Sequence, residues 1–285
     1  MNRIALDWGS SRLRAYAVDA SGDVVETRQA DTGVFTIATN DFERALRQLI
    51  GDWLDAHPQI EICAAGMIGS ANGWREAPYV ATPASSRALR ERVVQVPFEN
   101  SSHVLKIIPG VRHGTGAQVD VMRGEETQIF GLLPESGDGT IVDFRTHYTG
   151  ELYHWLSTQS SVSKVLAAHA AFDELAFDEA AAQAAQHPSD LLQQLFTLRA
   201  SVVARERTGA QAASATQGAL IGSDVANGMQ YLRRKTGTFS QLSLVGSTVL
   251  NAHYARVFQQ HGIAATLYDA DATVKGLHRI LGKPA

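Results

Sequence analysis

Residues 4–14 read Ile-Ala-Leu-Asp-Trp-Gly-Ser-Ser-Arg-Leu-Arg, and this stretch decides how the chain begins to fold. An apolar run ends at Asp7, a Gly-Ser turn follows, and residues 13–18 resume an alternating pattern, which together predict a β-hairpin. Gly9 lets the backbone approach a ligand closely, and the amides and hydroxyls of the two serines after it can donate to phosphate oxygens. Asp7 can hold Mg²⁺ directly or through water. The same residues also fit an ordinary hairpin with a polar turn, so this stretch by itself leaves both interpretations open.

The composition is that of an ordinary globular protein. With 285 residues the chain is long enough for two domains, and its 45% hydrophobic and 19% charged residues fit an apolar core with a polar surface. A net charge of −4 gives no reason to expect nucleic acid or an anionic membrane as a partner, so an anionic substrate would need a local basic site. The single cysteine, Cys63, excludes an internal disulfide and fits a reducing compartment. Because the sequence shows neither an apolar signal segment nor a stretch near the ~20 residues of a membrane helix, we expect a cytoplasmic protein.

The first third of the chain predicts a mixed sheet. Three strands come first, a helix of about residues 41–56 follows, and a short buried strand leads into a glycine-punctuated loop at 66–70. These strands do not alternate regularly with helices, so a uniform βαβ array is not expected. The predicted strands are Ile4–Leu6, Leu13–Val18, Val24–Arg28 and Ile60–Ala65.

The rest of the chain is mainly helical in pattern. We place the boundary between two lobes within residues 109–119, which gives lobes of 1–112 and 113–285, with the closing helix (272–285) as a candidate to pack back on the first lobe. The predicted helices are 85–94, 121–132, 150–169, 170–186, 189–200, 212–232, 249–260 and 272–281, and the predicted strands are 105–108, 242–245 and 266–268.

A second turn of interest lies at Gly246-Ser247-Thr248, between a predicted strand and a predicted helix. Gly246 permits close backbone approach, and the amino end of the helix presents free N–H groups and the positive end of the helix dipole. This pattern is also common in α/β proteins that bind nothing at the turn. Two such turns, one near each end of the chain, are nevertheless what two lobes holding a nucleotide between them would show.

Ordered motifs along nearly the whole chain resemble those of the 2-dehydro-3-deoxygalactonokinases, which are sugar-acid kinases of the actin/hsp70/hexokinase-like superfamily. The resemblance implies an α/β fold of the two-lobed actin-like ATPase (ribonuclease H-like) type. Each lobe would be a five-stranded mixed sheet flanked by helices, with ATP in the cleft between the lobes. The motifs that carry the resemblance are Asp7-Trp8-Gly9-Ser10, residues 65–70 with Gly73-Trp74, Ala77-Pro78-Tyr79, Ile107-Ile108-Pro109-Gly110, residues 121–128, Asp143-Phe144-Arg145-Thr146, Leu195-Phe196 with Arg199, residues 218–222 and Val245-Gly246-Ser247.

The resemblance also implies roles for individual residues. The amino-terminal hairpin would bind phosphate, the turn at 246–248 would contact the adenosine moiety, and the loop after the fourth predicted strand would form part of the sugar-acid pocket. Mg²⁺ would be held by Asp7, water and ATP, because no His/Cys/Asp cluster has the spacing of a metal site. The residues concerned are Asp7, Gly9, Ser10 and Ser11 for phosphate, Gly246, Ser247 and Thr248 for adenosine, and Met67, Ile68, Gly69, Gly73 and Trp74 for the sugar acid.

The implied substrate carries a carboxylate, and a guanidinium can bind a carboxylate with two parallel hydrogen bonds. Three arginines are candidates for this contact: Arg14, Arg123 and Arg145. Any one of them can instead form a structural salt bridge. Arg123 and Arg145 are favoured because each lies inside a motif of the family.

Phosphoryl transfer needs a group that accepts one proton from the attacking hydroxyl. The adjacent Glu125 and Glu126 open an apolar helix, where neighbouring carboxylates raise each other's proton affinity and the helix amino end can hold one in place. The segment also looks similar to the Gly-x-Glu-Glu segment of polyphosphate phosphatases of the same superfamily. A solvated helix start is the alternative interpretation, and Glu151 and Asp143 are rival carboxylates.

One family element is missing from the sequence. Family members carry a second phosphate-binding hairpin just before the Asp-Phe-Arg-Thr motif, whereas here residues 132–140 run directly into Ile141-Val142-Asp143. Either the printed sequence lacks a segment at this place, or the chain is contiguous and lacks half of its phosphate site. We favour the first explanation, because the loss of an inner strand would leave unpaired backbone groups.

The sequence therefore predicts an ATP-dependent kinase that phosphorylates the C6 hydroxyl of 2-dehydro-3-deoxy-D-galactonate. The alternative from another class is a catalytically weakened sensor that binds nucleotide or sugar acid. A phosphohydrolase of the same fold is a third interpretation, and it rests on the Glu125-Glu126 likeness. The sequence leaves open whether the galactonate or the gluconate derivative is preferred, and whether the protein forms a homodimer.

Overall fold

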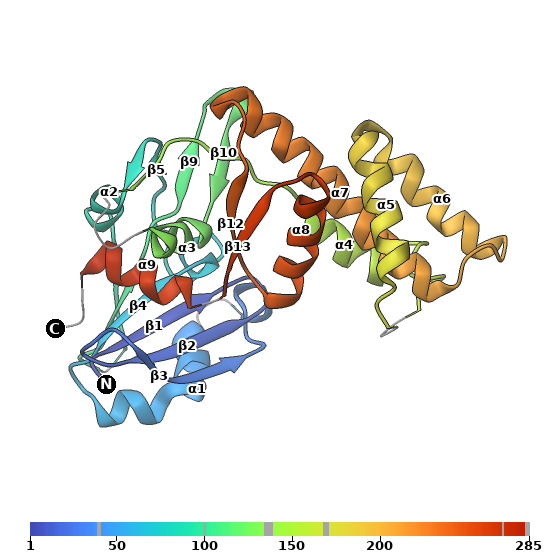
Figure 1. Ribbon diagram of the computed structural model, residues 1–285. Helices are drawn as coiled ribbons and strands as arrows, with labels where there is room; N and C mark the ends of the chain where they lie inside the picture. Colours follow the sequence, from blue (N-terminus) through green and yellow to red (C-terminus); the bar gives the residue numbers. More distant parts are fainter. Residues whose placement is uncertain (39–40, 100, 134–138, 168–170, 270, 283–285) are drawn as a thin grey trace. The chain divides into compact units, whose positions relative to one another are not determined.

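A computed structural model describes residues 1–38, 41–99, 101–133, 139–167, 171–269 and 271–282 of the chain (Figure 1). The chain folds into two compact units. The first comprises Met1–Thr146 and Asp269–Ala285, and the second comprises His147–Tyr268. Within the described residues, none of the helices combines the length and apolar character that a bilayer crossing requires.

The first unit is built on a six-stranded mixed sheet of order β3-β2-β1-β4-β8-β7. The predicted hairpin is confirmed: β1 (Arg3–Trp8) runs antiparallel to β2 (Leu13–Val18), with Asp7 opposite Arg14. On its other side β1 pairs in parallel with β4 (Glu61–Ala65), which places Asp7 opposite Ala65. The carboxyl ends of β1 and β4 therefore lie next to each other at one edge of the sheet.

Alternation along these strands produces two separate apolar faces. Ile4, Leu6 and Trp8 of β1 lie in the core that α1 (Phe42–Ala56) covers, whereas Ala5 lies in the core on the opposite face. That opposite face is covered by α3 (Glu125–Leu132) and α9 (Ala272–Leu281), which lie side by side (Figure 1). The helices α3 and α9 can approach closely because Gly131 and Gly276 stand where a Cβ atom would overlap the facing backbone.

The remaining elements of the first unit surround this sheet. They include a three-stranded sheet of order β10-β9-β5 and a two-stranded sheet of β11 and β6. Their bounds are β3 (Val24–Ala30), β5 (Val80–Ala81), β6 (Ala84–Ser85), α2 (Ser86–Arg90), β7 (Val94–Pro97), β8 (Val104–Ile107), β9 (Val111–His113), β10 (Asp120–Met122), β11 (Thr140–Ile141), and the 3-10 turns η1 (Val34–Thr36), η2 (Met67–Gly69) and η3 (Gly116–Gln118).

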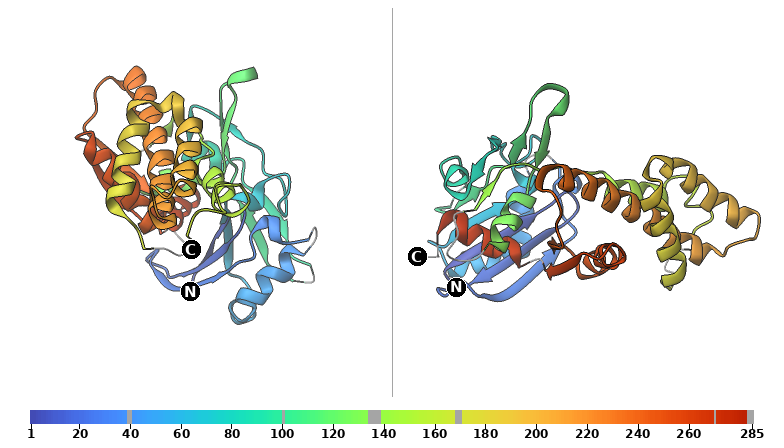
Figure 2. Two further views of the ribbon diagram at one scale, coloured as in Figure 1. Left: turned by 90° about the vertical axis from the view of Figure 1, so that its right-hand side faces the viewer. Right: turned by 45° about the horizontal axis from the view of Figure 1, so that its top comes forward.

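The second unit is mainly helical. Its longest helix, α7, packs along α5, and both Figures 1 and 2 show the two helices side by side. Gly218 and Gly222 allow this approach, because a Cβ atom at either position would overlap the backbone of α5. The bounds are α4 (Thr149–Thr158), α5 (Glu174–Gln186), η4 (Pro188–Asp190), α6 (Leu191–Val203), α7 (Gly209–Thr236), β12 (Gln241–Val245), α8 (Thr248–Gln260) and β13 (Ala264–Tyr268).

The α/β class with mixed sheets and flanking helices is confirmed, but the expected five strands in each lobe are not: the main sheet of the first unit has six strands. Within residues 147–167 and 171–268 the only sheet is the parallel pair of β12 and β13, instead of the five strands that the resemblance implied. The place where the resemblance led us to expect the second phosphate-binding hairpin, residues 134–138, lies outside the described residues.

The division into units differs from the expected lobe boundary at 112/113. Residues 113–146 belong to the first unit because β10 pairs with β9, β11 pairs with β6, and α3 packs on α9. The chain then returns to the first unit at Asp269, so the closing helix α9 packs on α3, β1 and β4.

Four predicted helices are shorter than expected, among them the helix expected over 170–186, which starts at Glu174. Residues 121–122 belong to strand β10, and α3 starts only after Gly124. The φ of Gly124 is 112°, which is outside the helical region, so the helix cannot extend back through this residue. The helix expected over 85–94 is confined to α2, and the helix expected over 150–169 ends at Thr158. Apolar patterning does not separate a short strand from a helix start, which is why these boundaries were missed.

Candidate functional site

Three segments of the first unit meet at the edge where β1 and β4 end. Gly66 follows β4 with a φ of 99°, and a Cβ atom there would lie 2.7 Å from the carbonyl oxygen of Trp8. Gly124 precedes α3, and a Cβ atom there would lie 3.2 Å from the Cα atom of Gly66. The glycines thus bring together the amino-terminal hairpin, the turn after β4 and the start of α3.

The tip of the hairpin is a tight turn with an exposed outer surface. The amide of Gly9 donates to the carbonyl oxygen of Arg12 at 2.9 Å, and Ser10 and Ser11 are exposed. Asp7 lies at the base of the turn, where its Oδ2 atom accepts a hydrogen bond from Arg14 Nη1 at 3.1 Å. Burial raises the pKa of Asp7, and the positive charge of Arg14 opposes that rise.

The three candidate arginines differ in their partners. Arg14 is ion-paired with Asp7, so it neutralises the carboxylate that was predicted to hold Mg²⁺. Arg145 is exposed in the irregular segment between β11 and α4, and it has interactions of its own. Arg123 is buried between β10 and α3, and two of its N–H groups are enclosed there without a hydrogen-bond partner.

The surroundings of Arg123 explain how a guanidinium can be held inside the protein. Its Nη2 atom donates to the carbonyl oxygen of Ala77 at 2.8 Å, and its Cζ atom lies 4.3 Å from the ring centre of Tyr79. Its Nη1 atom lies against Gly69, where a Cβ atom would come within 2.8 Å of it. The Nε and Nη1 atoms are buried and have no hydrogen-bond partner. Unpaired donors of a buried cation are costly, so this group is suited to receive an anion.

The two adjacent glutamates have different environments. Glu125 is exposed, and its Oε2 atom accepts a hydrogen bond from the amide of Arg123 at 2.9 Å. Glu126 is fully buried, and it accepts hydrogen bonds from the amide of Gly124 at 2.7 Å and from Thr127 Oγ1 at 3.0 Å. Burial raises the pKa of Glu126 to about 7, the charge of Glu125 adds to this rise, and the hydrogen bonds oppose it. The pair therefore combines one accessible carboxylate with one enclosed carboxyl group.

The raised pKa of Glu126 predicts a pH-dependent stability. In the unfolded chain this carboxyl group titrates near 4.5, and in the folded protein near 7, so the folded state holds the proton more tightly. The free energy of unfolding should therefore fall as pH rises from about 4.5 to about 7, by up to about 3 kcal/mol. Urea unfolding at pH 5 and pH 8 measures this effect. Between these two pH values, the free energy of unfolding should fall less in Glu126→Gln than in the wild type. Glu125→Gln is the matched control, and equal losses in the wild type and Glu126→Gln would contradict the assignment.

The rival carboxylates lie in other surroundings. Asp143 Oδ1 is 3.1 Å from His113 Nε2, and His113 Nδ1 is 2.7 Å from Thr82 Oγ1, so Asp143 is part of a local polar cluster. Glu151 is exposed in the first turn of α4 and belongs to the second unit. Neither residue belongs to the three segments that meet beside Gly66.

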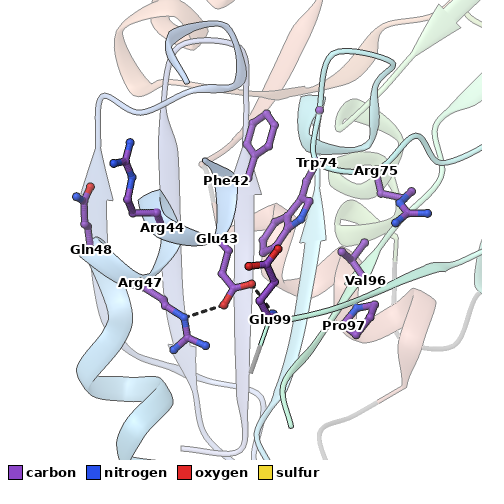
Figure 3. Close-up of a pocket in the computed structure, with 11 residues that line it drawn as sticks. Phe42, Glu43, Arg44, Arg47, Gln48, Trp74, Arg75, Val96, Pro97 and Glu99 are labelled. Atoms are coloured by element: carbon purple, nitrogen blue, oxygen red, sulfur yellow. Dashed lines mark hydrogen bonds and ion pairs between the residues drawn. The ribbon is translucent and has the colours of Figure 1, made fainter. Parts of the chain in front are cut away.

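The residues expected to form the sugar-acid pocket divide into two groups. Ile68 and Gly69 are buried in the turn beside Arg123, and Met67 is packed partly against the core. Gly73 and Trp74 instead line a cavity of about 680 Å³ between α1 and the end of β7 (Figure 3).

The cavity is lined both by charged side chains of α1 and by apolar side chains such as Val96 and Pro97 of β7. Glu43 accepts hydrogen bonds from Arg47 Nε and from the amide of Glu99, both at 2.8 Å (Figure 3). The Trp74 ring packs against Phe98 at a centroid distance of 5.3 Å. The cavity is lined by none of the residues Asp7, Arg123 and Glu125. Its volume therefore does not identify the place of the chemistry.

The turn predicted to contact adenosine is formed in the second unit, where β12 ends and α8 begins. Ser247 caps α8 by accepting a hydrogen bond from the amide of Leu250 at 3.3 Å, and Ser247 and Thr248 are exposed. The buried Asn251 links the turn to the end of β13, because its Nδ2 atom donates to the carbonyl oxygen of Tyr268 at 2.8 Å. This arrangement fits an exposed helix amino end that is available to a ligand.

Among the described residues, no group of three or more His, Cys, Asp or Glu side chains could hold a metal ion. Asp7 offers carboxylate oxygens of the kind that Mg²⁺ prefers, so the chain fits an ion that is shared with phosphate oxygens and water. Tyr79, Gly124 and Asn251 had no role predicted from the sequence, because their contributions depend on packing between distant segments. Tyr79 and Gly124 do lie inside motifs of the family, which was a signal for these two residues.

The sequence and the structure both match known proteins. Residues 7–280 match the family model of 2-keto-3-deoxy-galactonokinase. The chain is 33% identical over 286 residues to the 2-dehydro-3-deoxygalactonokinase of Escherichia coli (strain K12), covering 94% of this chain and 93% of that protein. It is 29% identical over 293 residues to a probable 2-dehydro-3-deoxygalactonokinase of Rhizobium meliloti (strain 1021), covering 95% of this chain and 93% of that protein.

A solved structure shares the fold. The crystal structure of a candidate 2-dehydro-3-deoxygalactonokinase from Sinorhizobium meliloti superimposes with a TM-score of 0.84 at 28% identity, over 98% of this chain and 97% of that one. The likeness shows that the chain shares the α/β fold of that protein. The family match covers most of the chain, so the chain belongs to the 2-keto-3-deoxy-galactonokinase family.

Proposed function

We propose that the protein transfers the γ-phosphoryl group of ATP to the C6 hydroxyl of 2-dehydro-3-deoxy-D-galactonate, which gives the 6-phosphate and ADP. The observation that carries this proposal is the meeting of three segments at one edge of the sheet. An exposed hairpin turn, a buried guanidinium with unpaired donors and an accessible carboxylate lie on segments joined by Gly66 and Gly124. These are the groups that a kinase for an anionic sugar needs.

Two turns of the chain, one in each unit, would contact different parts of the nucleotide. The hydroxyls and amides of Ser10 and Ser11 would donate to the phosphates, and Asp7 would help to hold the ion. The exposed turn of Gly246, Ser247 and Thr248 would contact adenosine. When bound, Mg²⁺ supplies positive charge that stabilises the transferring phosphoryl group.

Arg123 would bind the carboxylate of the sugar acid. Arg14 is paired with Asp7, whereas the Nε and Nη1 atoms of Arg123 have no partner. Both atoms are buried, and Nη1 lies against Gly69, so we expect the ligand to displace the Met67–Gly69 turn as it enters. Because Nε–H and Nη1–H point to opposite sides of the guanidinium, a carboxylate would satisfy one of these two donors with a charge-assisted hydrogen bond.

Glu125 would act as the base and Glu126 as a positioning residue. A base must reach the reacting hydroxyl, and Glu125 is exposed whereas both oxygens of Glu126 are engaged inside the protein. Glu125 would take the proton of the C6 hydroxyl while the hydroxyl oxygen bonds to the γ-phosphorus and ADP leaves. Glu126 would hold the Gly124 turn and thereby the start of α3.

The test is a coupled assay of ADP release with Mg-ATP and a panel of 2-keto-3-deoxy acids. We expect turnover above background with the galactonate derivative, and the gluconate derivative in the same panel measures epimer preference. Binding without turnover would favour the sensor, for which the comparisons offer no support. Phosphate release from ATP or polyphosphate without sugar acid would favour the phosphohydrolase.

A further inference from the structure

Residues 32–36 lie directly against the tip of the amino-terminal hairpin, and neither the family motifs nor the proposed catalytic groups include them. We propose that this segment is a positioning element that orients the turn of residues 9–12 toward the phosphates of the nucleotide, and that Gly33 is the residue on which it depends. The inference rests on the proposed function, because it assumes that this turn binds phosphate.

Two backbone hydrogen bonds join the segment to the turn. The amide of Val34 donates to the carbonyl oxygen of Gly9, and the amide of Phe35 donates to the carbonyl oxygen of Ser10, both at 3.0 Å. These bonds hold two carbonyl oxygens of the turn on the protein side. Phosphate is repelled by carbonyl oxygens and attracted by N–H groups, so this orientation favours phosphate binding.

The amides of the turn are left available as a consequence. The backbone N–H groups of Ser10, Ser11 and Arg12 have no acceptor within the described part of the protein, and the hydroxyls of the two serines have no partner there either. Three consecutive free amides beside a turn are the arrangement by which backbone groups bind phosphate. Their direction is set by the bonds from Val34 and Phe35 on the opposite side.

Gly33 is required by space and not by its own backbone conformation. Its φ of −74° and ψ of 169° are accessible to any residue. A Cβ atom at this position, however, would overlap the backbone atoms of Ser11 and Arg12. Any side chain at position 33 must therefore push the turn away from the segment, and backbone atoms cannot yield as a flexible side chain can.

The segment is itself fixed to the core of the first unit. Val34 is buried in the same core as Trp8 and Leu13, the residues that flank the turn. The Nε1 atom of Trp8 also donates to the carbonyl oxygen of Thr32 at 2.9 Å. The turn is thus held from behind by a rigid part of the protein, which reduces the reorganisation needed on binding.

The experiment compares Gly33→Ala with Gly51→Ala, in which the new methyl group enters open space on α1. Calorimetric titration with ADP and with adenosine separates the phosphate contacts from the adenosine contacts. For Gly33→Ala we expect ADP affinity at least about tenfold weaker, because charge-assisted hydrogen bonds are lost, with adenosine affinity unchanged. The KM for ATP should rise while the KM for the sugar acid stays the same, and Gly51→Ala should behave as the wild type.

The result that overturns the inference is a folded Gly33→Ala variant that binds ADP as tightly as the wild type, or one that loses ADP and adenosine affinity equally. Wild-type protein that binds no ADP would instead refute the proposed function. If the thermal melt shows that Gly33→Ala does not fold, Trp8→Phe decides. This change removes the donor to Thr32 together with part of a fully buried ring, so ADP and adenosine affinities are compared in a variant whose melt shows that it is folded. We expect ADP binding weaker by at least about twofold in Trp8→Phe, and unchanged binding would overturn the inference.

Discussion

Replacement of Arg123 by alanine should raise the KM for the sugar acid by about tenfold to a hundredfold and leave the KM for ATP nearly unchanged. A charge-assisted hydrogen bond from Nε or Nη1 to the substrate carboxylate would be lost, worth about 1.5–3 kcal/mol. Initial rates at varied sugar acid and fixed saturating ATP measure the effect. The unpaired state of these two atoms in the free protein is the reason to expect that they serve a ligand.

Two further variants separate substrate binding from a structural role of Arg123. Arg123→Lys keeps the charge but not the two-fold donor geometry, so it should recover only part of the loss. Tyr79→Phe keeps the ring that lies 4.3 Å from the guanidinium, so it should behave as the wild type. If Arg123→Ala lowers the thermal midpoint and raises both KM values to the same extent, Arg123 holds the loop around Ala77 and does not bind substrate.

Glu125→Gln should lower kcat at least tenfold, because an amide cannot accept the proton of the attacking hydroxyl; a tenfold change corresponds to about 1.4 kcal/mol in the barrier. Its KM values should change little, since the carboxylate is exposed and its one bond, to the amide of Arg123, can be made by the glutamine oxygen. Single-turnover rates with saturating Mg-ATP and sugar acid measure the chemical step.

Glu126→Gln is the matched comparison for this experiment. It should alter the pH dependence of stability, as described above, more than it alters the chemical step, because its oxygens are enclosed by Gly124 and Thr127. A larger loss of kcat in Glu126→Gln than in Glu125→Gln would reverse the two roles. If both variants keep more than about a tenth of wild-type kcat, the base lies elsewhere, and Asp143 or Glu151 becomes the candidate.

The alternating and amphipathic segments of the first unit were predictable from sequence because local pattern and tertiary burial agree there. The hairpin of residues 3–18, the helix α1 and the closing helix α9 lie where the pattern placed them. The two helices each bury the face that is apolar at the helical period, whereas the hairpin strands are apolar and buried on both faces. The elements that were misplaced are short, such as β10 and α2, in which two or three residues do not establish a period.

Candidate site residues were identified by type and spacing, but their chemical states were not. The sequence positions of Glu125 and Glu126 do not indicate that one side chain is exposed and the other is buried. That difference arises because Gly124 turns the chain and α9 covers α3 on the side of Thr127. Charge alone likewise does not distinguish the three candidate arginines, Arg14, Arg123 and Arg145. The structure separates Arg14 from Arg123, because Arg14 is ion-paired with Asp7.

The sequence by itself determined the class of fold, the family and the two turns suited to a nucleotide, because these depend on local periodicity and on motifs that are contiguous in the chain. Tertiary structure alone decided which donors remain unpaired, which carboxyl group is buried and why position 33 must be glycine. Those properties depend on atoms that are brought together from segments far apart in the chain, and solvent exclusion and steric overlap have no local signature in the order of residues.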